Sequence, residues 1–450
     1  MLKKIFEKDF LRNFLYLSIP FAIQNVLTSS VNLLDNIMVG KLGEKSIAAV
    51  SLANRPFFVF TLMTFGISGG CSIFISQYWG KRDEKGIKSV VFLNTVISLM
   101  ASIIFLFLTT AFPQNIMGLF SKEADVILEG TNYLRVIGVS ALFYSISFIF
   151  TTVLKATQSP IIPMAMGGVS LVTNGILNYC LIFGKLGFPA LGTLGAAYAT
   201  LISRIIECAL TVFLTLATKE FLMTNLREYF AIKKDLVVKF IKTAYPVFVS
   251  ETLWGLGVSI YSAVYGRMGK NFAAAANVAS TMEQVATFFV FGAGLASGVM
   301  VGKEIGAKNK ERAYDYTLRF SILNPLCALF FVALVIIFAP FFIKIFNLTS
   351  QTRTIAHHLI LICAFYLPFK TVTLTHIVGT LRNSGDTLFC FFMDFMGVWF
   401  IGVPLTIFTG LYLKLPMEAV YFLSMVEEII KSVFVLKRVL SKTYIKDLVN

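Results

Sequence analysis

A single carboxylate, Asp35, lies in the first long apolar segment of the sequence, among side chains that carry oxygen and nitrogen. If this segment is a helix, Gln24 and Thr28 share a stripe with Asp35, and Asn32 lies on the neighbouring stripe. An ionisable group is costly inside an apolar span, so it is a candidate for function, with a structural hydrogen-bond network as the alternative. We expect Asp35 to bind a cation, and Gln24 and Asn32 to face a cavity that takes up a solute.

Two asparagines in a later apolar segment could complete the cation site. Asn174 and Asn178 are four residues apart and therefore share one face of a helix. Thr200, in the next segment, offers a hydroxyl group. Amide oxygens, a hydroxyl and the Asp35 carboxylate together suit a hard monovalent cation, whereas paired asparagines alone more often join helices.

The second half of the chain has its own polar candidates. Glu251 is followed by Trp254, Tyr261 and Tyr265 along one side of a segment. Such a surface could hold an aromatic cation by charge and cation–π attraction, although a tryptophan can also anchor a helix at the membrane interface. Glu283 is a further candidate for the solute cavity.

Five more charged residues suggest ion pairs rather than a binding site. Glu427, Glu428 and Lys431 are spaced three and four residues apart, which predicts a local ion-pair cluster. Lys370 and Asp394 are expected to pair between the tenth and eleventh apolar segments.

The elements that must position these groups are membrane-spanning helices. The 450 residues are 57% hydrophobic and 14% charged, whereas soluble domains have about 25% charged residues. Apolar runs long enough to cross a bilayer recur, without the alternation typical of a transmembrane barrel. The sequence predicts an all-α membrane protein with twelve spans, at 14–40, 47–79, 90–112, 128–154, 163–184, 191–217, 240–266, 275–302, 318–346, 355–381, 388–412 and 417–440.

The chain contains an internal repeat. Residues 20–80 align without a gap onto 246–306, with identical residues that include Pro20/Pro246, Gly40/Gly266 and Gly80/Gly306. A second echo relates LKATQSP at 154–160 to LRNSGDT at 381–387, and both look like short cytoplasmic turns. We therefore expect an N-terminal six-helix lobe at 1–218, a cytoplasmic linker at 219–239 and a C-terminal lobe at 240–450, related by an axis along the membrane normal around a central cavity.

The distribution of charge predicts the orientation. The formal net charge is +15, and about two thirds of the 39 Lys and Arg residues fall in the termini and every second loop. This bias places both termini in the cytoplasm and explains the basic balance without a nucleic-acid partner. The charged N-terminus runs directly into a span longer than a signal-peptide core, so we expect a multi-pass protein of the cell membrane that keeps its first span.

The remaining residue types exclude several classes of function. The six cysteines lie singly in apolar segments, and the three histidines lack metal-ligand spacing. The Gly-rich stretches have the wrong spacing for a phosphate loop. The sequence has no pattern of a catalytic nucleophile or of paired carboxylates that would indicate an enzyme. We expect no cofactor and no bound metal beyond a Na⁺ at Asp35.

Two stretches carry a resemblance to a known family. LSIPFAIQNVLTSSVNLLDNIMVGKLGEKSIAAVSLA and AYPVFVSETLWGLGVSIYSAVYGRMGKNFAAAANVAS resemble the multidrug and toxic compound extrusion (MATE) family, and the likeness spans essentially the whole chain. The resemblance implies twelve helices in two pseudo-symmetric lobes and export of organic cations in exchange for inward Na⁺ or H⁺.

The family's cation site in the first lobe matches this sequence at Pro20, which can bend the first helix, and at Asp35, Asn174 and Thr200. Some members have an aspartate where this chain has Asn178, so one carboxylate is available instead of two. In the second half, Glu251 lies about a turn before the acid of the family's seventh span, and Thr371 and His376 stand in the tenth span in place of an acid. The resemblance therefore does not imply a cation site there.

The expected function is multidrug efflux by alternating access, with small organic compounds as substrates and the lipid bilayer as surroundings, in a monomer. Asp35 would bind the coupling cation, and the drug and the cation would exclude each other. A lipid-linked oligosaccharide flippase of the same superfamily is the alternative, but it needs a basic cavity, and only Arg204 and Lys370 offer interior cations. A receptor or scaffold would need neither the repeat nor Asp35. The sequence leaves the substrates and the choice between Na⁺ and H⁺ open.

Overall fold

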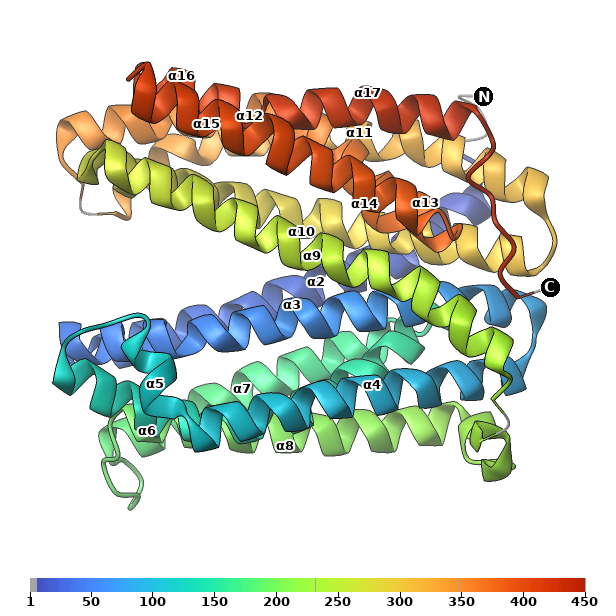
Figure 1. Ribbon diagram of the computed structural model, residues 1–450, viewed down its shortest axis with the longest axis horizontal. Helices are drawn as coiled ribbons and strands as arrows, with labels where there is room; N and C mark the ends of the chain where they lie inside the picture. The colour runs from blue at the N-terminus through green and yellow to red at the C-terminus, as the bar shows by residue number, and fades with distance from the viewer. Residues whose placement is uncertain (1–5, 231, 347, 450) are drawn as a thin grey trace. The chain divides into compact units, whose positions relative to one another are not determined.

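The computed structural model describes residues 6–230, 232–346 and 348–449, and every regular element within these ranges is a helix (Figure 1). Eleven helical stretches in this part of the chain are long and apolar enough to cross a membrane. Their bounds are α2 (Lys8–Gly40), α3 (Glu44–Lys81), α4 (Glu84–Ala111), α6 (Ala124–Ala156), α7 (Ile161–Phe183), α8 (Thr193–Thr218), α9 (Lys234–Met268), α10 (Lys270–Gly306), α11 (Lys310–Lys344), Ser350–Asn383 and Thr387–Tyr412. The all-helical membrane fold is thus confirmed.

The last two spanning stretches are composite. The stretch at 350–383 consists of α12 (Ser350–Thr373), the π-helix η3 (Leu374–Thr380) and α13 (Leu381–Asn383). The next contains α14 (Thr387–Phe395), the π-helix η4 (Met396–Gly402), α15 (Val403–Ile407) and the π-helix η5 (Phe408–Tyr412). Wider π-helical turns inside α-helices often accompany functional sites.

The twelfth predicted span consists of two shorter helices, α16 (Met417–Ser424) and α17 (Val426–Leu440). Neither reaches 18 residues, and α17 places Glu427 and Lys431 among its buried positions. The interruption at Met425 and the charged side chains explain why the apolar run at 417–440 is not one uniform helix.

Contacts divide the chain into two compact units. Unit 1 comprises residues 1–22, 76–82 and 245–450, and unit 2 comprises 23–75 and 83–244. Helix α2 passes from unit 1 to unit 2 after Ala22, two residues beyond Pro20. Helix α9 passes from unit 2 to unit 1 after Ala244, two residues before the equivalent Pro246. The predicted division into 1–218, 219–239 and 240–450 rests on the sequence repeat and stays a prediction.

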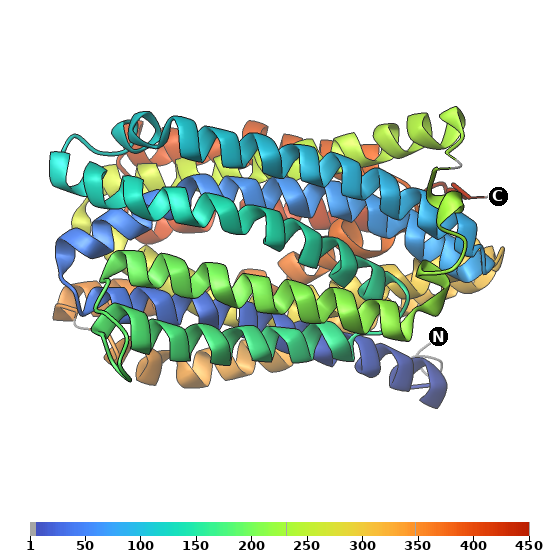
Figure 2. The same ribbon diagram turned by 90° about the horizontal axis from the view of Figure 1, so that it is seen from below.

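In unit 2, α8 packs against both α6 and α7, and α4 packs against α6 (Figures 1 and 2). The turn between α7 and α8 brings their ends together, because Leu191 N–H donates to the Leu181 carbonyl at 2.9 Å. A Cβ at Gly195 would lie 2.4 Å from that carbonyl oxygen. Glycine therefore sets the close approach of the two helices.

In unit 1, α10 packs against α11 and α12, and α12 packs against α17 (Figure 1). The apolar core around α10 and α12 includes Phe272, Leu359 and Ile360. A second core joins Phe10 and Phe14 of α2 to Phe320 of α11. The first turns of α2 are thus part of unit 1.

Backbone geometry repeats with the sequence. Arg82 and Lys308 both have positive φ, 60° and 64°, and they are equivalent positions in the repeat. Gln158 and Gly385, equivalent in the second echo, have φ of 59° and 83°. The two echo turns also share their hydrogen bonds, such as Ser159 N–H to Leu154 O and Asp386 N–H to Leu381 O. This left-handed helix ending is the same in both halves.

Two glycines of the repeat contact equivalent positions within unit 1. A Cβ at Gly80 of α3 would lie 1.9 Å from the Lys303 carbonyl oxygen, and a Cβ at Gly306 of α10 would lie 1.7 Å from the Gln77 carbonyl oxygen. Residues 77 and 303 are themselves equivalent in the repeat. The ends of α3 and α10 therefore cross backbone to backbone, in a contact that only glycine permits.

The segment after α8 folds onto α4 within unit 2. It contains the 3₁₀ turns η1 (Glu220–Leu222) and η2 (Leu226–Phe230). The buried Lys88 ammonium donates to the Thr224 carbonyl at 2.6 Å and to Glu228 Oε2 at 2.8 Å. Because Lys88 donates to this carboxylate, the pKa of Glu228 lies below its ordinary value.

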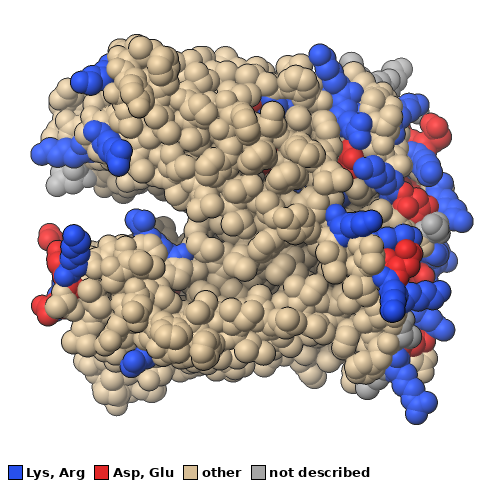
Figure 3. Space-filling view, viewed as in Figure 1, with Lys and Arg blue, Asp and Glu red and all other residues tan. Residues whose placement is uncertain are grey.

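On the face shown in Figure 3, charged side chains gather at the ends of the helices in each unit and are almost absent from their middle portions. Many large apolar side chains are exposed, among them Phe107, Phe213, Phe338 and Phe400. This pattern is typical of helices whose middle portions face hydrocarbon.

We predict that Gly306→Ala destabilises the protein, because the added methyl group forces α3 and α10 apart. Overpacking of this kind typically costs about 1–3 kcal/mol. The measurement is the thermal unfolding midpoint in detergent micelles. Gly266→Ala is the matched control, since nothing lies within 4 Å of its Cβ position. Equal midpoints for the two variants would contradict the close contact.

We also predict that the ion pair between Lys88 and Glu228 stabilises the protein in a pH-dependent manner. A lowered carboxyl pKa means that the stabilisation is present above the ordinary pKa of glutamate and is lost as the pH falls through the lowered value. The unfolding midpoint of Glu228→Gln should therefore lie below that of the unchanged protein at neutral pH and converge with it in acid. A difference that does not vary with pH would refute this origin.

Candidate functional site

Four polar side chains form a closed ring in the interior of unit 2. Asn178 Nδ2 donates to Asp35 Oδ1 at 2.5 Å and to Asn174 Oδ1 at 3.0 Å. Asn174 Nδ2 donates to Thr200 Oγ1 at 3.4 Å, and Thr200 Oγ1 donates to Asp35 Oδ2 at 3.4 Å. Asp35 is 8% exposed, and both asparagines are fully buried. The structure thus brings together the four residues that the sequence predicts as a cation site.

Three helices position this ring. Asp35 comes from α2, both asparagines from one face of α7, and Thr200 from α8. Two glycines of α7 let α2 approach, since a Cβ at Gly175 would lie 2.9 Å from a Leu34 methyl group and one at Gly167 would lie 3.6 Å from Leu27 Cβ. Small residues at a helix interface permit close packing in membranes.

One oxygen atom in the ring has no partner. Asn178 Oδ1 is buried and accepts no hydrogen bond, while its Nδ2 atom donates twice. A buried polar atom without a partner is costly and calls for an explanation. A rotation of this amide group would turn the oxygen toward Asp35, where it could serve as a ligand for a positive ion.

The other predicted residues of the first half lie outside this ring. Asn32 is exposed, and Gln24 is half-buried with an Oε1 atom that lacks a partner. Pro20 lies inside α2, which continues through it as a helix. Their predicted contacts with a solute stay predictions.

A second polar cluster lies nearby on α7 and α8. Glu207 Oε2 accepts from Ser170 at 2.9 Å and from Arg204 at 2.8 Å. The Arg204 guanidinium also lies over the Tyr144 ring, 5.3 Å from its centroid. Arg204 could be recognised from the sequence as an interior cation; Glu207 was not predicted, although its spacing of three residues from Arg204 on a helix was a usable signal.

In the second half, the predicted aromatic surface has a different arrangement. Glu251 accepts from Arg382 at 2.9 Å, so its charge is compensated within the protein. Tyr265 is buried and hydrogen-bonds Ser424 at 2.7 Å. Trp254 is 40% exposed, and Tyr261 lies close to Gly402. Substrate contact stays a prediction for these residues.

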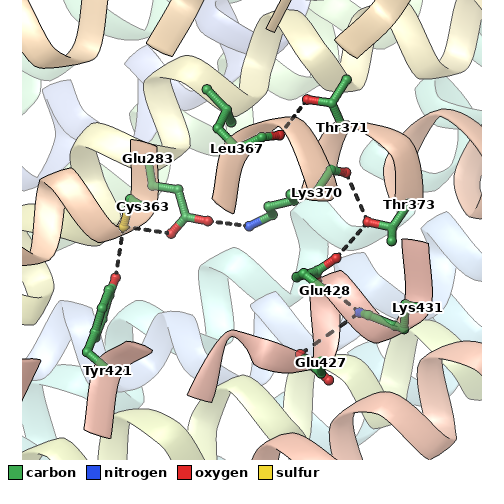
Figure 4. Close-up of polar contacts among 10 residues, drawn as sticks. All are labelled: Glu283, Cys363, Leu367, Lys370, Thr371, Thr373, Tyr421, Glu427, Glu428 and Lys431. Carbon is green, nitrogen blue, oxygen red and sulfur yellow. Dashed lines mark hydrogen bonds and ion pairs between the residues drawn. The ribbon is translucent and has the colours of Figure 1, made fainter. Parts of the chain in front are cut away.

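The acidic residues of the second half join an ion-pair network (Figure 4). Glu283 accepts from Lys370 at 2.5 Å and contacts the Cys363 thiol at 3.7 Å. The expected pair between Lys370 and Asp394 is wrong, because Lys370 reaches α10 instead, and Asp394 accepts from Ser250 at 2.9 Å.

The predicted cluster on α17 is confirmed. Lys431 Nζ lies 3.0 Å from Glu428 and 3.9 Å from Glu427. Glu428 also accepts from Thr373 at 2.7 Å, which links α17 to α12. In Figure 4 the Lys370 and Lys431 side chains lie on either side of Glu428.

Metal-binding groups built from His, Cys, Asp and Glu are absent from the described residues. His376 is buried and contacts Ser321 and Thr380 at 3.0 and 2.7 Å. Thr371 donates to the carbonyl of Leu367. These two residues of the tenth span are satisfied by local contacts.

Comparison with known proteins identifies the family. The MatE family model matches residues 20–180 and again 246–408, so it covers both halves of the repeat. The "Probable multidrug resistance protein YoeA" of Bacillus subtilis (strain 168) is 28% identical over 408 residues, which are 90% of this chain and 88% of that protein. The "Probable multidrug resistance protein NorM" of Thermotoga maritima is 24% identical over 406 residues, 89% and 85% of the two chains.

A solved structure shows the same fold. The protein in "Crystal structure of MATE in the straight conformation" superposes with a TM-score of 0.87 over 96% of each chain, at 18% sequence identity. The family model, the repeat and the all-helical fold agree. This chain belongs to the MatE family, and it is a multi-pass membrane transporter of the multidrug efflux class, not an enzyme.

Proposed function

We propose that this protein is an antiporter of the cell membrane that exports small organic compounds, often cationic, in exchange for inward Na⁺ or H⁺. Both termini would lie in the cytoplasm, as the distribution of Lys and Arg indicates. The two predicted six-helix lobes would alternate in exposing a central cavity to either side, and one chain would suffice for the cycle.

The observation that carries this proposal is the ring around Asp35. In the ring, an N–H of Asn178 lies against the carboxylate, in the place that a cation would take. A bound Na⁺ would draw the Asn178 oxygen, the Asn174 oxygen and the Thr200 hydroxyl oxygen toward itself. A proton would need only the carboxylate. The same four side chains thus support either ion.

Obligatory exchange requires that the ion and the drug exclude each other. A carboxylate without its ion leaves a negative charge in an apolar interior, which favours an organic cation in the cavity; a neutralised carboxylate removes that attraction. Entry of one positive charge across ~100 mV releases about 2.3 kcal/mol. That sustains a gradient of about fiftyfold for a neutral substrate. When a monovalent organic cation leaves in exchange for one monovalent ion, no net charge crosses the membrane. The membrane potential then contributes nothing, and the ion concentration gradient drives export.

Pro20 supports a coupling between the ring and the helix backbone. Proline removes one backbone hydrogen bond and allows a helix to bend. It lies two residues before α2 leaves unit 1 and fifteen residues before Asp35. A change in the charge of Asp35 would therefore act on a helix that can bend at Pro20.

The flippase alternative finds no support in the interior charges. A pyrophosphate needs cations that are free to contact it. Arg204 is paired with Glu207 and Lys370 with Glu283. The two interior cations on which that reading depended are therefore compensated by acids.

We predict that Asp35→Asn abolishes ion-driven efflux while the protein stays folded, since the amide cannot bind a proton or compensate a Na⁺ charge. The measurement is efflux of a fluorescent organic cation from proteoliposomes, with Na⁺ and pH gradients imposed separately. Dependence of the unchanged protein on one gradient identifies the coupling ion.

The control for this assay is Asp125→Asn, at an exposed carboxylate paired with Lys45 at a helix end. It should transport like the unchanged protein. Full efflux by Asp35→Asn would refute the proposed ion site, and an absence of gradient-driven flux in the unchanged protein would favour the flippase reading.

We further predict that Asn178→Ala weakens the apparent affinity for the coupling ion. Removal of one buried polar partner costs about 1–3 kcal/mol, which corresponds to roughly 5- to 150-fold in affinity. Asn32→Ala is the matched comparison, because Asn32 is an exposed amide three residues from Asp35. We expect it to change the KM for the organic substrate but not for the ion. If Asn32→Ala weakened the affinity for the ion and Asn178→Ala changed only the KM for the organic substrate, the ion and substrate contacts would not be separated as proposed.

A further inference from the structure

One cluster of buried and half-buried charged side chains in unit 1 holds more acids than cations. Its central acids are Glu251, Glu283, Asp394, Glu427 and Glu428, and its central cations are Lys370, Arg382 and Lys431. Each cation has a close acidic partner: Lys370 has Glu283 at 2.5 Å, Arg382 has Glu251 at 2.9 Å and Lys431 has Glu428 at 3.0 Å. Asp394 and Glu427 are left without a cation of their own.

The two remaining acids differ in their surroundings. Asp394 accepts a hydrogen bond from Ser250 at 2.9 Å. Glu427 is 6% exposed, its Oε1 lies 3.9 Å from Lys431, and its Oε2 is buried without a hydrogen-bond partner. A carboxylate in this position shares the Lys431 ammonium group with Glu428 and lies at the longer distance from it, so its charge is only partly compensated, which an apolar interior disfavours.

Two glycines and a tyrosine lie close to the Glu427 carboxyl group. A Cβ at Gly397 would lie 3.2 Å from Glu427 Oε2, and a Cβ at Gly402 would lie 3.2 Å from Glu427 Cδ and 1.9 Å from Tyr261 Oη. Both glycines belong to the π-helix η4. The Tyr261 hydroxyl is also buried without a hydrogen-bond partner.

The titratable neighbours of Glu427 come from three helices. Lys431 and Glu428 lie on α17 itself, Asp394 lies on α14 and Tyr261 lies on α9. From α12, Lys370 points toward Glu283 (Figure 4), and its charge also acts on Glu428. Two of these neighbours are acids, and the single nearby ammonium group is already held by Glu428 at the shorter distance.

We propose that Glu427 is a second ion-binding site of this protein, one that takes a proton and not Na⁺. A sodium ion needs several oxygen ligands, and the Lys431 ammonium group beside Glu427 would repel it. A proton needs no such set of ligands, because it binds directly to one carboxylate oxygen. The Tyr261 hydroxyl oxygen beside Glu427 can accept a hydrogen bond from the protonated carboxyl.

Release of this proton would disturb the network of Figure 4. A charged Glu427 competes with Glu428 for Lys431, and Glu428 is also the acceptor of Thr373 on α12. The proton at Glu427 is thus linked to the contact between α17 and α12. A role for this proton in the exchange with drug rests on the proposed antiport function. The binding of the proton to Glu427 does not depend on that function.

The experiment is infrared difference spectroscopy on the purified full-length protein in lipid nanodiscs, between neutral and alkaline pH. A protonated carboxylic acid has a C=O stretching band that a carboxylate lacks. We expect such a band in the unchanged protein at neutral pH, its loss in Glu427→Gln, and a shifted band in Glu427→Asp, which keeps a titrating group if Glu427→Gln does not fold.

Two control variants separate this site from its neighbours. Glu251→Gln, at another interior acid of unit 1, should keep the band, because Glu251 is paired with Arg382. Asp35→Asn should keep it as well, and Na⁺ should leave it unchanged. A band that survives in Glu427→Gln, or a band that Na⁺ displaces, would overturn the proposal. Failure of Asp35→Asn to affect transport would refute the antiport site but not this one.

Discussion

The cost of an uncompensated charge in an apolar interior is the constraint on which the functional parts of this protein depend. Each ionisable group within the helical interior must be neutralised by a partner, by hydrogen bonds or by an ion. Arg204, Lys370 and Arg382 satisfy the constraint with acidic partners. Asp35 satisfies it with an asparagine amide and a threonine hydroxyl, which are neutral. A carboxylate whose hydrogen-bond partners are neutral has no cationic side chain bound to it and is therefore available to a proton or a metal cation.

Helix packing supplies the geometry for this chemistry. The ring of Asp35, Asn174, Asn178 and Thr200 needs three helices at close range, and glycines at 167, 175 and 195 permit that approach. The contacts of Gly80 with Lys303 and of Gly306 with Gln77 show the same close approach at the ends of α3 and α10. Because side chains are absent at these crossings, backbones meet directly and small displacements of one helix must be followed by its neighbour.

Much of the fold follows from the sequence alone, since apolar length and the period of polar residues report directly on spanning helices. The predicted first eleven spans agree with the observed helices, and the repeat in sequence reappears in the turns at Gln158 and Gly385. The four-residue spacing of Asn174 and Asn178 correctly predicts that their side chains meet. Local spacing is informative wherever partners lie on one helix.

Partners on different helices were harder to predict. Glu251 meets Arg382 only because of how α9 and α13 pack, and Glu283 meets Lys370 only because of how α10 and α12 pack, which no spacing in one segment reveals. The break between α16 and α17 and the π-helical turns of η3 and η4 likewise depend on tertiary packing. The unpartnered oxygens of Asn178 and Glu427 could be recognised only after their neighbours were placed.

The central claim is that one buried carboxylate serves the coupling ion and, indirectly, the drug, so that binding of one weakens binding of the other. Equilibrium binding of a fluorescent organic cation to the purified protein, measured across a series of Na⁺ concentrations and pH values, tests this most directly. We expect that the Kd of the organic cation rises with either Na⁺ or H⁺ and that Asp35→Asn removes this dependence. A Kd that neither ion alters in the unchanged protein would contradict it.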